Sequence, residues 1–399
     1  MEILRKLFEM TSIGDMAFSP GTFIMLLIGL SLLYLGVVKK YEPLLLVPIG
    51  FGLLLANALK GGMSVVPGTD EIMHLSLLEI AKDYGIMNFL YYSLIKTGLL
   101  PPIIFMGVGA LTDFGPMLRN LRLAFFGAAA QLGIFTVVMA AVAAGFTMKE
   151  AGALGIIGGA DGPTAIYTTI ILAPHLLGPI AIAAYSYMAL VPVIIPFMVR
   201  LTTSKNELLI NMKQQEKMYP NKRPIKNLKM AKILFPIVTG GIVAILVPSS
   251  VPLIGFLMFG NLIKEIGVST ERLSKEAAGS IMNTATIFLG LTVGATMTAE
   301  TFLNPKTLMI IVGGFLAFCI SVAGGIYAVK IYNLFSKKKI NPLIGATGLS
   351  AVPMASRVAN EIGLKNDPNN HLLQYAMASN ISGVIGSAVA AGVMISFLA

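Results

Sequence analysis

The run from Gly158 to Tyr167, GGADGPTAIY, holds the residues of this chain most suited to chemistry. It places one carboxylate, Asp161, inside a long and nearly continuous apolar stretch. A charge at membrane depth is costly, and irregular backbone is tolerated there only where protein or water covers it. The run therefore predicts a broken intramembrane segment with an ion-binding acid at the break. The residues expected to break the helix are Gly158, Gly159, Gly162 and Pro163.

Asp161 is the only acid between Glu150 and Glu207. A carboxylate among backbone carbonyls freed by glycine and proline would suit a hard cation such as Na⁺, or a proton. The alternative is a loop acid at a membrane surface. The flanks 151–157 and 165–173 are apolar, which favours the buried ion site.

A second run, NPLIGATGLSAVPMASR from Asn341 to Arg357, offers complementary groups. Asn341 and Ser350 supply neutral oxygens, and Arg357 is the one cation. A guanidinium there could grip a carboxylate or pair with Asp161, whereas a structural arginine would snorkel to the inner interface. The residues expected to break this helix are Gly345, Gly348 and Pro353.

Other polar residues lie within apolar stretches. Tyr185 and Tyr187 fall in 178–199, and Asn380 falls with Ser387 in 371–398. Their buried hydroxyl and amide groups need partners, which either hydrogen bonds between helices or an ion could supply, and both interpretations stay open. Asp113, in FMGVGALTDFGPM, is better explained as a surface acid at a helix end.

Composition defines the class to which these sites belong. The chain has 399 residues, 56% hydrophobic and 12% charged, which is typical of a polytopic membrane protein. The formal charge of +10 is better explained by Lys and Arg in cytoplasmic loops than by nucleic acid. Three scattered histidines and one cysteine argue against a transition-metal site, so Na⁺ is the only metal expected.

Apolar stretches of spanning length divide the chain into four parts. We expect an N-terminal segment 1–19, a first membrane repeat 20–199, a basic cytoplasmic linker 200–231 and a second membrane repeat 232–399. The expected spans are 20–38, 43–60, 98–113, 122–147, 178–199, 232–247, 250–264, 278–297, 306–332 and 371–398. The two Gly/Pro-rich stretches, about 149–175 and 340–360, stand apart from these spans.

The two halves repeat weakly, and paired Gly/Pro-interrupted segments point to a binding site near the membrane midplane. The matches are Pro48, Asn57 and Lys60 with Pro252, Asn261 and Lys264; Gly109-Ala110 with Gly294-Ala295; and Gly155, Gly158, Pro163 and Ala165 with Gly345, Gly348, Pro353 and Ala355. If both broken segments are re-entrant, each half has about five spans and the halves are inverted. The basic loops then share the cytoplasmic side; parallel repeats would divide them between the two sides.

These motifs also carry a resemblance. GGADGPTAIY, NPLIGATGLSAVPMASR, FMGVGALTDFGPM and the ending NISGVIGSAVAAG resemble the β subunit of the biotin-dependent, sodium-pumping decarboxylases. The resemblance implies that Asp161, Asn341 and Asn380 bind sodium, and that Ser350, Tyr185 and Tyr187 serve the ion or proton path. It also implies that Arg357, with Gly345 nearby, matters for carboxybiotin or for helix geometry. The chain has no biotin-attachment motif of the Met-Lys-Met type.

The resemblance implies a multi-subunit complex in a bacterial or archaeal plasma membrane. Biotin would sit on a partner carrier, beside a carboxyltransferase subunit and a small single-span membrane subunit, and the β subunit could form a homo-oligomer. The expected function is decarboxylation of carboxybiotin coupled to proton uptake and outward Na⁺ transport. The alternatives are a stand-alone cation antiporter or sodium–carboxylate symporter, which would share the broken helices, and a receptor or purely structural subunit, which would have no use for a buried Asp161.

Overall fold

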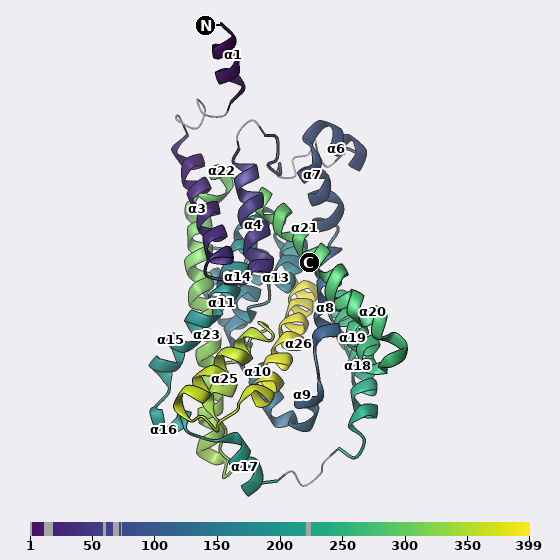
Figure 1. Cartoon of the computed structure of the whole chain (residues 1–399), viewed down its shortest axis with the longest axis vertical. Helices are drawn as coiled ribbons and strands as arrows, with labels where there is room; N and C mark the ends of the chain where they lie inside the picture. The colour runs from purple at the N-terminus through teal and green to yellow at the C-terminus, as the bar shows by residue number, and fades with distance from the viewer. Residues whose placement is uncertain (1, 12–18, 59–60, 67–71, 73, 221–224) are drawn as a thin grey trace.

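The protein is an elongated bundle of helices (Figure 1), shown by a computed structural model that describes residues 2–11, 19–58, 61–66, 72, 74–220 and 225–399. No strand occurs among these residues. Lys60, residues 221–224 of the predicted linker and most of 12–19 lie outside them. The all-helical class predicted from the sequence is confirmed.

The first part of the chain runs from the separate helix α1 to a bent pair of helices. Its helices are α1 (Glu2–Met10), α3 (Pro20–Val37), α4 (Pro43–Ala56), α6 (Leu77–Tyr84), α7 (Ile86–Leu90), α8 (Leu100–Leu111), α9 (Gly115–Arg119), α10 (Leu121–Ala130), α11 (Leu132–Ala143), α12 (Met148–Gly155), α13 (Gly162–Leu172), α14 (Leu177–Ala189) and α15 (Val191–Thr202). Proline at the first helical position starts both α3 and α4, where its missing N–H costs nothing.

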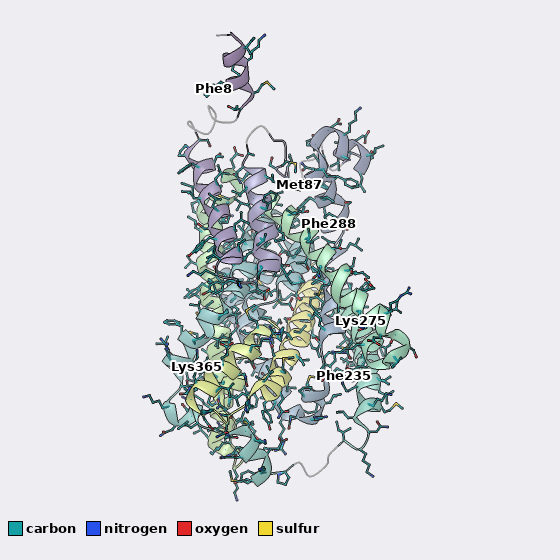
Figure 2. All side chains as sticks on the ribbon, in the orientation of Figure 1. Phe8, Met87, Phe235, Lys275, Phe288 and Lys365 are labelled. Atoms are coloured by element: carbon teal, nitrogen blue, oxygen red, sulfur yellow. The ribbon has the colours of Figure 1, made fainter. Side chains whose placement is uncertain are left out.

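The second part follows two short helices of the basic linker, α16 (Lys205–Leu208) and α17 (Met212–Met218). Its helices are α18 (Leu228–Leu246), α19 (Val251–Ile266), α20 (Glu271–Glu276), α21 (Met282–Ala295), α22 (Ala299–Phe302), α23 (Pro305–Phe335), α24 (Pro342–Gly345), α25 (Met354–Asn366) and α26 (Leu373–Leu398). Lys275 of α20 and Lys365 of α25 lie at the periphery on opposite sides (Figure 2).

Seven of the described helices are long and apolar enough to cross a membrane, and two bent pairs would raise that number to nine. The bent pairs are Ile86–Ile95 with Leu100–Leu111 and Pro174–Met188 with Val191–Thr202. These helices coincide with the predicted spans except at 43–60, where α4 has only 14 residues. At 1.5 Å per residue α4 is about 21 Å long, short of the roughly 30 Å hydrocarbon core.

Helices from the two predicted halves pack against each other. The α4 backbone lies directly on α21, because Gly52 faces the Leu291 carbonyl without room for a β-carbon. The α8 backbone lies on α19 in the same way, through Gly109 and Leu257. Close approach between small residues is how helices associate in lipid, where no hydrophobic force drives them together.

Two helices are broken in the interior. The first break follows α12 as a 3₁₀ turn, Ile156–Gly159, and Ala160 then takes the left-handed conformation with φ 54° before α13 begins. The second separates α24 from α25 at residues 346–353. The two meet where the Ser350 N–H donates to the Gly159 carbonyl, 3.0 Å away. A break interrupts the regular run of helical hydrogen bonds, and here a backbone amide of the second break is satisfied by a carbonyl of the first.

Candidate ion-binding site

Asp161 occupies the N-cap position of α13 and is only 4% exposed. Its Oδ1 accepts a hydrogen bond from the Thr164 N–H at 3.1 Å. A short polar side chain is preferred at this position because it satisfies an amide that has no partner within the helix. The sequence around the carboxylate therefore explains both where α13 starts and how one oxygen of Asp161 is oriented.

A relay of hydroxyl groups links Asp161 to the second break. The Ser387 hydroxyl of α26 donates to Asp161 Oδ2 at 2.6 Å, and Ser350 Oγ lies 2.7 Å from Ser387 Oγ. Ser350 Oγ also lies within 3.1 Å of the Gly383 carbonyl. When Ser387 gives its only proton to Asp161, Ser350 must donate to Ser387. Two of the predicted site residues, Asp161 and Ser350, are thus joined through Ser387.

The charge of Asp161 meets only neutral groups. In the described part of the chain it forms no ion pair, and its hydrogen bonds come from a hydroxyl and a backbone amide. The Thr164 hydroxyl and the Tyr185 hydroxyl are buried and have no hydrogen-bond partner among the residues that the structure describes. The Tyr185 ring packs directly on Gly162, the residue after Asp161. A buried carboxylate is stabilised when a cation or a proton joins it, so this cluster can accept either one.

The remaining predicted ligands lie farther along the same elements. Asn380 of α26 donates to the Leu349 carbonyl and accepts from the Ser356 hydroxyl at 3.0 Å. It therefore holds the second break at the residue before Ser350. The carboxamide of Asn341 is engaged elsewhere, since its Nδ2 donates to the Leu208 and Ile210 carbonyls of the linker at 2.9 and 3.0 Å.

The two predicted tyrosines serve different neighbourhoods. Tyr185 lies beside Asp161, whereas Tyr187 donates to the Ile311 carbonyl and packs on Gly314 of α23. Residues two apart on a helix point in different directions, which explains the separation. Proximity to the acid was not readable from the sequence, because both tyrosines lie in the same apolar stretch.

Arg357 is exposed on α25. Burial raises the pKa of Glu42, and the positive charge of Arg357 opposes that rise. Arg357 therefore lies near the turn between α3 and α4, which also contains Lys39 and Lys40. The structure does not pair Arg357 with Asp161.

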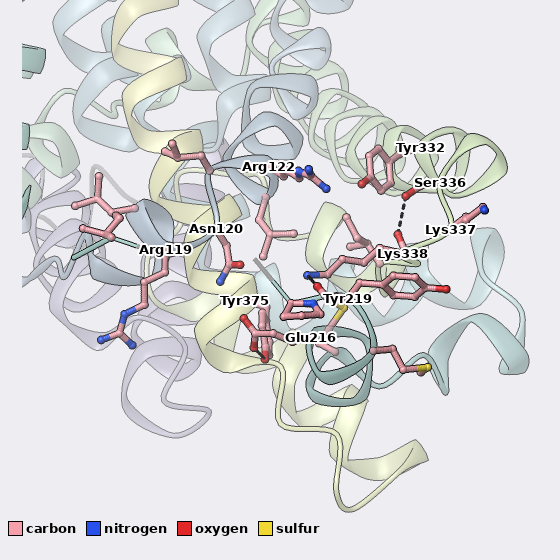
Figure 3. Close-up of a pocket in the computed structure, with 18 residues that line it drawn as sticks. Arg119, Asn120, Arg122, Glu216, Tyr219, Tyr332, Ser336, Lys337, Lys338 and Tyr375 are labelled. Atoms are coloured by element: carbon pink, nitrogen blue, oxygen red, sulfur yellow. Dashed lines mark hydrogen bonds between the residues drawn. The ribbon is translucent and has the colours of Figure 1, made fainter. Parts of the chain in front are cut away.

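A cavity of about 820 Å³ opens near the linker, between α9, α10, α17 and the ends of α23 and α26 (Figure 3). The basic residues that line it in the described part of the chain are Arg119, Arg122, Lys337 and Lys338. Glu216 also lines the cavity and accepts a 2.6 Å hydrogen bond from the Tyr375 hydroxyl. The sequence predicts that the excess Lys and Arg lie in cytoplasmic loops, but it does not predict that these four share a cavity.

Asp113 belongs to a different type of site. It is half-exposed, pairs with Lys232 at 2.8 Å, and accepts a 2.8 Å hydrogen bond from the Gly115 N–H. Burial works to raise the pKa of Asp113, but Lys232 and the Gly115 amide hold it below its usual value. Lys232 also pairs with Glu265 at 3.0 Å. This cluster ties α18 and α19 to the loop after α8.

The helices and the buried carboxylate define a multi-pass membrane protein with an acid held between two broken helices. The sequence model of the Na⁺-transporting oxaloacetate decarboxylase beta subunit matches residues 21–398. The chain is 46% identical to the probable oxaloacetate decarboxylase beta chain of Vibrio cholerae, over 95% of each chain. It is 47% identical to the methylmalonyl-CoA decarboxylase subunit beta of Propionigenium modestum, over 96% of this chain and 97% of that one.

A third relative, the oxaloacetate decarboxylase beta chain of Klebsiella pneumoniae, is 44% identical over 100% of this chain and 99% of its own. The chain therefore belongs to the family of β subunits of sodium-transporting decarboxylases. It is the membrane subunit of a sodium pump, and the family resemblance inferred from the sequence motifs is confirmed.

Proposed function

We propose that this subunit decarboxylates carboxybiotin carried by a partner and uses that reaction to drive Na⁺ outward, with Asp161 as the ion-binding carboxylate. One observation supports the ion site above all others. Asp161 is buried at the junction of the two breaks, and its donors among the described residues are all neutral. Burying a charge without a counter-ion is unfavourable, so the site favours uptake of a cation or a proton.

The ligand set that we propose for Na⁺ is Asp161, Ser350, Asn380 and Asn341, with Ser387 bridging the first two. Carboxylate, hydroxyl and amide oxygens are the ligands that hard cations prefer. Asn380 would act through the backbone it holds at Leu349. Asn341 would join only if the linker released its carboxamide. Tyr185 and Tyr187 are proposed to support the ion or proton path.

The proposed coupling follows from the reaction itself. Cleavage of the bond between the biotin nitrogen and the carboxyl carbon releases CO2, and the nitrogen then takes up a proton. Na⁺ and H⁺ compete for the oxygens around Asp161, so arrival of the ion can release the proton that the reaction consumes. Exporting one charge costs about 2.3 kcal/mol per 100 mV, which decarboxylation must supply.

Carboxybiotin is proposed to dock near Arg357. The guanidinium is exposed, carries two-pronged donors that match a carboxylate, and lies near a turn that contains Lys39 and Lys40. Positive loops mark the cytoplasmic side, where we place the linker and this turn. We propose that the biotin is attached to a partner subunit and that the complex also contains a carboxyltransferase subunit and a small single-span membrane subunit. We further propose that this chain forms a homo-oligomer within that complex in the plasma membrane.

Inverted repeats are proposed for the architecture, and two pairs of contacts support them. Asn57 of the first half donates to the Met297 carbonyl at 2.7 Å, and its match Asn261 donates to the Thr112 carbonyl at 2.8 Å. Ser321 of the second half donates to the Gly158 carbonyl of the first break at 2.6 Å. Gln131 of the first half donates in turn to the carbonyl of Gly348, the match of Gly158.

Reconstitution into liposomes tests the proposal against a stand-alone transporter. The complete complex, supplied with the substrate of its carboxyltransferase, is expected to release CO2. It should also accumulate radioactive Na⁺ inside liposomes in which its cytoplasmic face points outward. Supplied with that same substrate, this chain alone is expected to do neither. Supplied instead with free carboxybiotin, it is expected to release CO2 slowly and in a Na⁺-dependent manner. Rapid Na⁺ movement by the isolated chain under a proton gradient would instead identify a secondary transporter.

A further inference from the structure

Gln131 lies at the point where the span formed by α10 and α11 is interrupted, and it is 6% exposed. Its Nε2 lies 3.2 Å from the Gly127 carbonyl of its own helix. It lies 3.2 Å from the Gly348 carbonyl of the second break and 3.3 Å from the Gly383 carbonyl of α26. One amide group thus contacts three separate elements around the ion site.

These contacts determine which way the amide faces. Rotating the amide by half a turn would place Oε1 against three carbonyl oxygens, none of which can donate a hydrogen bond. Oε1 therefore points away from them. It is buried and has no hydrogen-bond partner among the described residues. A buried polar atom left without a partner costs free energy and calls for an explanation.

The Oε1 atom faces the first break beside Asp161. A β-carbon built on Gly159 would lie 3.4 Å from Gln131 Oε1 and 3.1 Å from Ser387 Cβ. Ser387 is the residue whose hydroxyl binds Asp161, and the Gly159 carbonyl accepts the Ser350 amide. An acceptor without a donor among the described residues therefore lies against Gly159, two residues before Asp161 and on the side of the break where Ser387 packs.

We propose that Gln131 Oε1 is a ligand of the transported cation; this inference rests on the ion site proposed above. An amide oxygen is a good ligand for a hard cation, and the ion supplies the partner that the oxygen lacks. An amide is not protonated at physiological pH, so Gln131 strengthens binding of Na⁺ without strengthening binding of H⁺ at Asp161. Gln131 would therefore set the selectivity of the site for Na⁺ over H⁺.

Two substitutions separate the oxygen from the Nε2 donors. Gln131→Met removes both, whereas Gln131→Glu keeps an oxygen and removes the donors. In the purified complex, Gln131→Met is expected to raise the Na⁺ concentration for half-maximal decarboxylation about tenfold, with most of the rate retained at saturating Na⁺. Gln131→Glu is expected to shift it much less. Equal shifts in both variants would show a role through Nε2 alone and overturn the proposal.

Gly159→Ala provides a second approach if Gln131→Met does not fold. The added methyl group would fill the space in front of Oε1 while leaving Gln131 intact, and it should weaken Na⁺ binding measured by Na⁺-dependent thermal stabilisation. Unchanged Na⁺ stabilisation in Gly159→Ala would count against an ion in that space. Lithium and pH series in the same assay are expected to show Na⁺ selectivity reduced in Gln131→Met.

Asn261 is a matched control, because its Oδ1 is also buried without a partner in the described part of the chain. Its Nδ2 donates to carbonyls of α8 and the following loop, which are remote in sequence from both breaks. Asn261→Leu is expected to lower stability and leave the Na⁺ requirement unchanged.

Asp161→Asn distinguishes failure of the proposed role of Gln131 from failure of the proposed ion site. If Asp161→Asn loses Na⁺ binding while Gln131→Met keeps it, the ion site stands and the role of Gln131 is refuted. If Asp161→Asn binds Na⁺ normally, the ion site itself is refuted.

Discussion

Two acids of this protein differ in how their charges are balanced. Asp113 lies beside Lys232, which also pairs with Glu265, and Lys264 donates to the neighbouring Leu111 carbonyl at 2.9 Å. Asp161 is more deeply buried, and its hydrogen-bond donors within the described ranges are the Ser387 hydroxyl and the Thr164 amide. Within the part of the chain that the structure describes, the first acid has a lysine as counter-charge and the second has none.

The difference assigns the two acids different work. An acid paired with lysine is already neutralised, so it can hold helices together but has little affinity for a further cation. An acid surrounded by hydroxyl and amide groups gains most from a cation that arrives from outside. Substitutions at the two sites should therefore affect different measurements, stability in one case and Na⁺ dependence in the other.

The largest expected effect comes from neutralising each acid in turn. Asp161→Asn should weaken Na⁺ binding by at least about a hundredfold, the size expected when one partner of a buried charge pair is removed. Asp113→Asn should leave the half-saturating Na⁺ concentration unchanged and lower the melting temperature. Na⁺-dependent decarboxylation and thermal unfolding of the purified complex measure both. Loss of Na⁺ dependence in both variants would erase the distinction.

Arg357→Lys tests whether Arg357 acts on carboxybiotin and not on the ion site around Asp161. Lysine keeps the charge but loses the paired donors that match a carboxylate, so turnover of carboxybiotin should fall about tenfold. Because Arg357 does not contact Asp161, Na⁺ protection should be retained. A residue that only snorkels would be replaced by lysine without effect. If Na⁺ binding fails while turnover at saturating Na⁺ survives, Arg357 belongs to the ion site instead.

Ser387→Ala and Ser350→Ala rank the two hydroxyls of the relay. Ser387 touches the carboxylate directly, and a hydrogen bond to a charged group contributes roughly 1.5–3 kcal/mol. Its loss should raise the half-saturating Na⁺ concentration about tenfold. Ser350 acts through Ser387, so its loss should have an effect of only a few fold. The reverse order, measured by Na⁺ titration of decarboxylation, would place the ion nearer the second break.

Lys232→Met removes the counter-charge from the other acid. Glu265, whose side chain is 10% exposed, would then lose its partner, and the variant should lose about 1–2 kcal/mol of stability. The Na⁺ requirement of decarboxylation should stay within twofold of the wild type. A Na⁺ requirement that rose with the loss of stability would show that the two regions are coupled.

The smallest effect concerns acid pH and the linker. Burial works to raise the pKa of Glu207, yet bonds from Ser204 and the pair with Lys330 hold it below the ordinary 4.5. The Asn369 amide and Asn211 likewise lower the pKa of Asp367. A carboxylate with a lowered pKa stabilises the docked linker at pH values above its ordinary pKa. That stabilisation is lost progressively as the pH falls from the ordinary pKa through the lowered one. Hydrogen-exchange protection over 205–218, corrected for the intrinsic exchange rate at each pH, should therefore fall below about pH 4.5, and less so in Lys330→Met.

Several features of this protein were readable from its amino-acid sequence because their physical causes are local. Apolar length predicts the spans, and glycine with proline predicts interruptions near Gly158 and Pro353. The cost of a charge in an apolar stretch singles out Asp161. Even so, Ala160 and not a glycine takes the left-handed turn, because tertiary contacts can hold a strained residue that local preference disfavours.

The contacts that make Asp161 a site were decided only by the tertiary structure. Ser387 is 226 positions from Asp161, and Gln131 is 217 positions from Gly348. Periodicity and composition carry no information about which polar group meets which across such separations. Asn341 and Arg357 show the same limit, since the linker engages one and the turn at Glu42 lies near the other. The sequence alone identified the carboxylate that needs a partner. The packing of the two broken helices and α26 determined which oxygens surround it, because hydrogen bonds depend on positions in space.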